Sequence, residues 1–506
     1  MMLRYFFAFL FLCCHLGAHE TLPEEKSIPY SHIETVPSRR QTATIQGKQL
    51  SYNVRAGKCL VPGKDETSVG PVSYFAYFVE SDKNRPLAFC FNGGPGSSSI
   101  WLHMGVLGPK IVQTDDLCFP TMPGQYENNP DSLLSVCDLV FIDPVSTGYS
   151  YATKPEDESP FHEVENDIHS ISNFIRLFLT TYNRWSNPKI IIGESYGSAR
   201  AIGVARLLQE HYFININALG LVSLALNTGA LEFHHPSPTP LVTALPTLAL
   251  TAHYHKALST SMLEKSAEEI FDEASTFAVQ HYSPALFAGS TLAKDKEHEI
   301  SQRLSELTSI PTQEIEQQHL RLTPHIFSQK FLINQNLRFG RFDARVTGWK
   351  IPLAFLRSPL PDPSVYTTAS SFTSSFHAYL LNDLNYTENR PYTVIAKVFE
   401  NWRWDAANQP SEGFGYLDFS DDLRHVFYQN PNLQVMVAAG LYDFAIPAFS
   451  QKYSLDTLFL PKEQADNIRF TTYESGHMMY LHPPSRKKFC ANLRQLVQEA
   501  CYRKNT

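Results

Sequence analysis

The amino-acid sequence predicts an α/β fold, in which a doubly wound and mostly parallel β-sheet is interrupted by a helical insertion. Three observations support this prediction. Short apolar runs stop at glycine or proline, as strands that are buried on both faces do. A helix with one apolar stripe separates two of these runs, which favours alternating strands and helices. The strand pattern breaks off near residue 228 and returns at residue 433.

The first strands are expected at residues 42–55 and 71–79, where alternating and aromatic-rich stretches occur. The buried runs that follow are, in order, PLAFCFNGG, DLVFIDPV, KIIIGES, LGLVSLALNTG and LQVMVAAG. Between the second and the third, residues 163–182 place their apolar side chains on one face of a helix. Another helix is expected at about residues 196–210, directly after KIIIGES.

The N-terminus fits a secretory signal peptide over residues 1–18, because Arg4 precedes an apolar run and Leu16-Gly17-Ala18 offers a cleavage site. The apolar run is shorter than the ~20 residues that span a bilayer. We therefore expect no membrane span and an exported protein, either periplasmic or secreted.

The rest of the chain is expected to form one sheet domain in two parts, residues 19–227 and 401–506. Residues 228–400 would be a helical cap insertion between these parts. This middle segment begins with the proline-rich stretch HHPSPTPLVTALPTL and continues with polar, helix-prone residues 261–319.

Charge and cysteine content limit the partners and the cross-links that the chain could have. The formal net charge is −8 and no long basic run occurs, which argues against a nucleic-acid partner. Disulfide pairing and oligomeric state are left open by the sequence. Cys490 and Cys501 lie on one predicted helix, about 16 Å apart, so they cannot bond to each other. No C-x-x-C pair occurs, and we expect neither a metal site nor a cofactor.

The stretch GESYG, residues 193–197, places Ser195 between a predicted strand and a predicted helix. It fits the pattern G-x-S-x-G, in which a serine in a strained turn exposes its hydroxyl as a nucleophile. The alternative is a serine that only caps the following helix, a role that needs no acid such as Glu194 before it.

A nucleophilic serine needs a base, and in this arrangement an aspartate and then a histidine follow it along the chain. Asp443 follows the run LQVMVAAG, and His477 follows another strand-like run. Both therefore lie where the carboxyl ends of parallel strands put functional groups. We expect His477 to accept the Ser195 proton and Asp443 to fix the imidazole tautomer. Each residue alone could be an ordinary turn or loop residue, and the ordered set is the stronger signal.

The glycine-rich stretch FNGGPGSSS, residues 91–99, directly follows a predicted strand. It would bring the Gly94 N–H beside the Tyr196 N–H, and these two donors could hold the oxyanion of acyl transfer. Nucleotide binding is disfavoured because no G-K-[ST] follows the glycines. The remaining alternative is a plain glycine turn.

Together these stretches resemble the serine carboxypeptidase family. The matching pieces are FNGGPGSSS, FIDPVSTGYSYA, IIGESYG, GLYDFAIP and ESGHMMY, in the family's order from about residue 88 to 484. The resemblance implies an α/β-hydrolase fold and an enzyme that removes single residues from peptide or protein C-termini, often at acidic pH. It also implies a role for each matching site residue: a catalytic triad of Ser195, Asp443 and His477, oxyanion donors on Gly94 and Tyr196, a site for the substrate's terminal carboxylate at Asn92 and Glu194, and Met478 and Tyr149 near the substrate pocket.

Glu194 gives this implied activity a pH dependence. A carboxyl group can hydrogen-bond a carboxylate only when it carries a proton, since like charges repel. Peptides with a free C-terminal acid should therefore be cleaved with a higher kcat/KM at pH 4–6 than at pH 8.

Three positions depart from the family pattern, as in a divergent branch of bacterial type. Val106 stands where the family often has a second carboxylate-binding glutamate, and Cys90 replaces a common tryptophan. An asparagine common shortly after the aspartate is also absent from YDFAIP. Val106 leaves open an esterase or acyltransferase that uses the same triad. A non-catalytic binding protein on this fold is a third hypothesis, against which the intact triad argues.

Overall fold

The structure is a computed structural model that describes residues 34–502, apart from residues 36–37, 65, 67, 81–83, 116–121, 234–236, 352–361 and 405–416. The predicted signal peptide, residues 1–18, therefore lies outside the described residues, as does Cys118.

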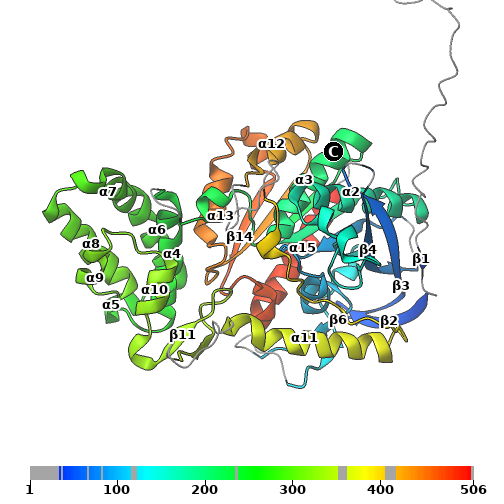
Figure 1. The fold of residues 1–506 in the computed structure, drawn as a ribbon, viewed down its shortest axis with the longest axis horizontal. Coiled ribbons are helices and arrows are strands. Elements are labelled where there is room, and N and C mark those ends of the chain that lie inside the picture. Colours follow the sequence, from blue (N-terminus) through cyan, green and yellow to red (C-terminus); the bar gives the residue numbers. More distant parts are fainter. Residues whose placement is uncertain are drawn as a thin grey trace, which may run out of the picture.

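A ten-stranded sheet forms the centre of the molecule (Figure 1). Its strand order is β1-β3-β4-β8-β5-β9-β10-β13-β14, and β2 pairs with β3. From β8 to β14 in this order neighbouring strands run parallel, whereas β1 to β4 are antiparallel. The strands are β1 (Glu34–Thr35), β2 (Arg39–Ile45), β3 (Lys48–Pro62), β4 (Val69–Val79), β5 (Leu87–Phe91), β8 (Asp138–Asp143), β9 (Lys189–Glu194), β10 (Ala218–Val222), β13 (Gln434–Gly440) and β14 (Ile468–Tyr473).

The five short apolar runs of the sequence are the strands β5, β8, β9, β10 and β13, and every residue in these strands is buried. The N-terminal prediction was wrong in one respect. Residues 42–55 do not form one strand, because the chain reverses between β2 and β3 at Gln46 and Gly47, with φ of 50° and 73°. Two successive residues with positive φ are typical of a tight hairpin turn whose twist matches the flanking strands.

Helices cover both faces of the sheet (Figure 1). Helices α2 (Val164–Thr181), α3 (Tyr196–Tyr212) and α12 (Ser420–Gln429) pack their apolar side chains into the core on one face. Helices α11 (Pro363–Asn382) and α15 (Pro483–Tyr502) contribute to the core on the other face. The predicted doubly wound, mostly parallel α/β-hydrolase fold is thereby confirmed. Shorter helices are α1 (Ile100–Leu102), α13 (Ala448–Asp456) and α14 (Lys462–Ala465).

A separate helical lobe stands beside the sheet, at the left of Figure 1. It has its own apolar core, which also takes in side chains from the loop after β13, among them Tyr442 and Phe444. A capping box between Ser266 and Glu269 fixes the start of α6. The lobe contains α4 (Thr239–Tyr254), α5 (Thr260–Leu263), α6 (Ala267–Phe277), α7 (Ser283–Ala288), α8 (Lys294–Thr308), α9 (Thr312–Gln317) and α10 (Pro324–Lys330).

Short strand pairs and one continuous C-terminal helix complete the fold. The pairs are β6 (Lys110–Val112) with β7 (Tyr126–Asn128) and β11 (Leu337–Phe339) with β12 (Thr347–Trp349). Cys490 and Cys501 lie on α15, as predicted, and both are free thiols. Within the described ranges, no helix combines the length and the apolar character needed to cross a membrane.

Candidate active site

The predicted nucleophile, Ser195, lies at a sharp bend between β9 and α3. Its backbone has φ 60° and ψ −131°, a conformation that costs roughly 1–3 kcal/mol for a residue with a side chain. Hydrogen bonds hold the bend on both sides, because Ser195 N donates to Val222 O at 2.8 Å and Ser198 N donates to Ser195 O at 2.8 Å. A rigid strained turn of this kind presents the serine hydroxyl beyond the end of the strand.

The glycine-rich loop after β5 runs directly against this bend. A Cβ atom at Gly93 would lie 2.5 Å from Gly197 N and 2.6 Å from Tyr196 N, so only glycine permits the approach. Tyr196 is the first residue of α3, and its N–H therefore has no acceptor within the helix. Gly94 is the next residue of this loop, so its N–H lies on the segment that contacts the bend. The two predicted oxyanion donors thus belong to segments that are in contact.

The predicted base and its partner are joined by a hydrogen bond. His477 Nδ1 and Asp443 Oδ2 are 2.7 Å apart, and both side chains are buried. The other carboxylate oxygen of Asp443 accepts the N–H groups of Ala445 at 2.7 Å and Ile446 at 3.0 Å. In the described residues no direct hydrogen bond links the Ser195 hydroxyl to the imidazole, and such contacts often tighten only when substrate is bound.

The segment Phe342 to Arg345, between β11 and β12, contacts the loop that carries His477. Phe342 O accepts His477 N at 2.6 Å, and the Phe342 ring meets the imidazole edge-on with centroids 4.8 Å apart. Asp343 Oδ2 accepts Gly476 N at 3.1 Å, and Arg345 donates to Glu474 O at 2.8 Å. This segment also bonds to the loop that carries Asp443, through Ala344 N to Tyr442 O at 3.0 Å, and it therefore helps to fix the position of the imidazole.

Glu194 is a buried acid directly before the predicted nucleophile. Its Oε2 atom accepts the hydroxyl of Tyr480 at 2.7 Å. Burial raises the pKa of the Glu194 carboxyl to about 7, against the lowering effects of the His477 charge and of hydrogen bonds from Tyr480 and Asn92. The carboxyl can therefore hold its proton in weakly acidic solution, where an exposed glutamate is ionised.

Asn92 is held in place by buried polar contacts. Its Oδ1 atom accepts Leu102 N at 3.1 Å, and its backbone carbonyl accepts Arg200 Nη1 at 2.6 Å. Arg200 in turn donates to Asp167 Oδ2 at 2.6 Å, and Tyr196 donates to the same oxygen at 3.0 Å. One buried ion pair thus ties the glycine-rich loop to both helices beside the bend.

The other predicted site residues are buried. Met478 follows His477 and is 9% exposed, while Tyr149 is 3% exposed. The Tyr149 ring packs edge-on against Tyr392 with centroids 5.1 Å apart. Val106, which stands at the position of the family's second glutamate, is fully buried in the apolar core.

Two parts of the candidate site were not predicted from the sequence. Tyr480 lies in the quoted stretch ESGHMMY, and its only signal was a hydroxyl in an otherwise apolar run. The segment Phe342 to Arg345 carries no motif at all. The structure brings Asn92, Glu194 and His477 together, since the Glu194 carboxyl is affected by both neighbours.

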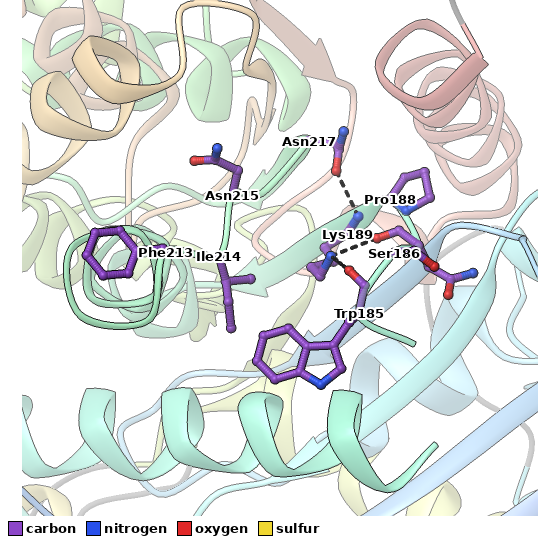
Figure 2. Close-up of a pocket in the computed structure, with 9 residues that line it drawn as sticks. Trp185, Ser186, Pro188, Lys189, Phe213, Ile214, Asn215 and Asn217 are labelled. Carbon is purple, nitrogen blue, oxygen red and sulfur yellow. Dashed lines mark hydrogen bonds between the residues drawn. The ribbon is translucent and has the colours of Figure 1, made fainter. Parts of the chain in front are cut away.

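A cavity of about 360 Å³ lies at the opposite end of the strands. Figure 2 shows its lining, residues 185–189 together with residues from 213 to 217. Lys189 opens β9, whereas Ser195 follows the end of that strand. The Lys189 ammonium already donates to Trp185 O at 2.7 Å and Asn187 O at 2.8 Å. The one charged group that lines this cavity therefore serves the fold, and we assign no site to the cavity. No group of three or more potential metal-ligating side chains occurs in the described residues.

The profile of a family described as serine carboxypeptidase matches residues 67–482, which is most of the chain. The chain belongs to the serine carboxypeptidase family. The matched range contains the bend at Ser195, the glycine-rich loop, Asp443 and His477. The resemblance seen in the sequence is confirmed.

Similar proteins of known name share only part of their length with this chain. The lysosomal protective protein of Mus musculus is 30% identical over 166 residues, which are 31% of this chain and 33% of that protein. The pheromone-processing carboxypeptidase KEX1 of Saccharomyces cerevisiae is 24% identical over 277 residues, or 52% of this chain and 34% of that protein. The chain thus spans about a third of the length of these relatives. Among solved structures, a proline iminopeptidase of Mycobacterium smegmatis covers 88% of this chain and 98% of its own, with 12% identity and a TM-score of 0.34.

Proposed function

We propose that this chain is a serine-type carboxypeptidase that releases C-terminal residues from peptides or proteins through an acyl-enzyme on Ser195. The observation that carries the proposal is Glu194, a buried acid beside the nucleophile with a pKa of about 7. A general serine hydrolase has no need of an acid there. An acid at this position can recognise a terminal carboxylate only when it is protonated, because it is then a neutral hydrogen-bond donor.

In the proposed reaction the Ser195 hydroxyl attacks the carbonyl carbon of the last peptide bond. His477 accepts the hydroxyl proton at Nε2, while the hydrogen bond from Nδ1 to Asp443 holds the imidazole in the required tautomer. The N–H groups of Gly94 and Tyr196 bind the oxyanion. His477 then gives its proton to the departing amino acid, and water enters to hydrolyse the acyl-enzyme in the same way.

The leaving residue would be recognised through its carboxylate and its side chain. We assign the carboxylate to Asn92 and Glu194, which lie at the start of the glycine-rich loop and directly before Ser195. Met478 and Tyr149 are proposed to border the pocket for the side chain. No cofactor is required for this chemistry.

The proposal predicts a pH dependence for free-acid substrates. For a blocked dipeptide with a free C-terminus, kcat/KM should fall by about tenfold between pH 6 and pH 8, because a carboxyl with a pKa of about 7 is about one tenth protonated at pH 8. The same dipeptide with an amidated or esterified C-terminus should not show this fall. Steady-state kinetics of the three substrates over pH 4–8 would measure the difference.

Two outcomes would contradict the proposal. A flat profile for the free acid, or an identical profile for the amide, would mean that Glu194 does not bind the substrate's carboxylate. The ester serves as the control for the triad itself, because its turnover needs Ser195 and His477 but no carboxylate recognition.

An esterase or acyltransferase on the same triad is the second candidate function. Val106 favours it, because a buried valine removes one acid from the place where the family often has two. Turnover of the ester without turnover of the free-acid peptide would favour this second function. Failure of a fluorophosphonate probe to label the protein would contradict both functions and leave a binding role.

We also propose that residues 1–18 direct export of the protein to the periplasm or the exterior. The apolar run after Arg4 supports this, and one relative is named a lysosomal protective protein. N-terminal sequencing of the protein recovered outside the cytoplasm should begin at His19. An intact Met1 on the exported protein would contradict cleavage.

A further inference from the structure

Tyr480 reaches Glu194 from the loop that carries His477. It lies in the short 3-10 helix η11 (Met479–Leu481) and is fully buried. Its hydroxyl donates to Glu194 Oε2 at 2.7 Å. The ring lies so close to Gly105 that a Cβ atom there would be 2.6 Å from the Tyr480 ring. The ring is therefore confined, and the position of the hydroxyl is fixed by packing.

The direction of this hydrogen bond decides which oxygen of Glu194 carries the acidic proton. In a neutral carboxylic acid the carbonyl oxygen is the better acceptor, and the other oxygen is the donor. Because the Tyr480 hydroxyl donates to Oε2, the proton of neutral Glu194 belongs on Oε1. An acid that is held in this way uses Oε2 as an acceptor and keeps its O–H on Oε1, where it can donate to a ligand.

We propose that Tyr480 is the positioning residue of the carboxylate site: it holds Oε2 of Glu194, so that Oε1 presents its proton to the terminal carboxylate of the substrate. This inference rests on the proposed function of Glu194. In many family members a second glutamate stands at the position of Val106, which here has only an apolar side chain. In this protein the Tyr480 hydroxyl would take over the role of that second acid. The enzyme would thus recognise a free C-terminal carboxylate with a single carboxyl group of its own, that of Glu194.

The groups around Glu194 fix the sign of the expected pH effect. Burial raises the Glu194 pKa, the His477 charge and the hydrogen bonds from Tyr480 and Asn92 lower it, and the Asp443 charge raises it. Burial also keeps the pKa of the Tyr480 hydroxyl well above its ordinary value, so this hydroxyl stays a donor over the working range. Removing the hydroxyl takes away a donor that favours ionised Glu194. Neutral Glu194 should then persist to higher pH.

The test is Tyr480→Phe, compared with wild type on free-acid, amidated and esterified dipeptides. We expect KM for the free acid to rise about three- to tenfold at pH 5, because the proton on Glu194 is no longer oriented. The fall in kcat/KM at alkaline pH should move to higher pH. Turnover of the ester and the rate of fluorophosphonate labelling should stay at the wild-type level.

Tyr473→Phe is the matched control, because Tyr473 is a buried tyrosine at the end of β14 whose hydroxyl accepts Asn492 Nδ2 at 2.9 Å. It should change neither KM nor the pH profile. An unchanged alkaline fall in Tyr480→Phe, or an equal loss on amide and ester, would overturn the inference about Tyr480. Wild-type enzyme that does not discriminate free acid from amide would instead overturn the proposed function, so the two failures are distinguishable.

Discussion

The variant Ser195→Ala is expected to lose fluorophosphonate labelling and to lower kcat for peptide and ester substrates by about a million-fold. The reason is that Ser195 supplies the only oxygen that forms the acyl-enzyme in the proposed reaction. Labelling with the probe followed by mass spectrometry of the modified peptide, together with steady-state kinetics, measures both effects. Ser186→Ala is a suitable control, because Ser186 is exposed and lies at the opposite end of β9.

Thermal unfolding of the Ser195 variants shows whether a loss of activity comes from loss of the nucleophile or from loss of the folded structure. Ala and Ser both carry a Cβ atom, so Ser195→Ala keeps the strained backbone with φ 60° and should unfold at the wild-type temperature. Ser195→Gly should be equally inactive, and more stable by about 1 kcal/mol, because glycine tolerates positive φ. Labelling that persists in either variant would show that another residue is the nucleophile.

Much of the sheet was predictable because its strands are buried on both faces. Such strands read as unbroken apolar runs, and the runs that end at Phe91, Asp143 and Glu194 appear in the structure at their predicted places. The N-terminal hairpin was missed for a physical reason. Its turn is made by Gln46 and Gly47, and Gln-Gly is a weaker turn signal than Asn-Gly or Asp-Gly.

The candidate site was predictable to the extent that its residues follow strands. Ser195, Asp443 and His477 come after β9, β13 and β14, which are parallel, and the carboxyl ends of parallel strands meet at one edge. Tyr480 could not be assigned from sequence, because its role depends on a contact across 286 positions of the chain. The same holds for Phe342, whose carbonyl accepts His477 N across 135 positions of the chain.

These contacts converge on the His477 loop. Asp443 holds the imidazole from the loop after β13, Phe342 O accepts the backbone N–H from the segment between β11 and β12, and Ser223 Oγ donates to His477 O at 2.8 Å. A histidine that is held at its ring, its backbone N–H and its carbonyl loses little entropy when substrate binds, which favours proton transfer. Among the described residues, Asp443 is the one hydrogen-bond partner of a His477 ring nitrogen, so we expect it to set the tautomer of the ring.

The variant Asp443→Asn is therefore expected to lower kcat by about ten thousand-fold while KM stays within about threefold. Oδ1 of Asp443 accepts two backbone N–H groups, from Ala445 and Ile446, and only an oxygen can accept them. In the variant, the amide oxygen of the new side chain would take that place and turn its NH₂ group toward His477 Nδ1. Nδ1 would then be the acceptor, and the ring proton would move to Nε2. With a proton on Nε2, His477 cannot accept the proton of Ser195.

Kinetics and the rate of fluorophosphonate labelling measure this loss, and both should fall together because both begin with deprotonation of Ser195. Asp456→Asn is the matched control, since Asp456 is an exposed aspartate paired with Lys452 at the end of α13. It should leave kcat unchanged. An Asp443→Asn enzyme within tenfold of wild type would mean that another group fixes the His477 tautomer, and the hydrogen bond of 2.7 Å between His477 and Asp443 would then have only a structural role.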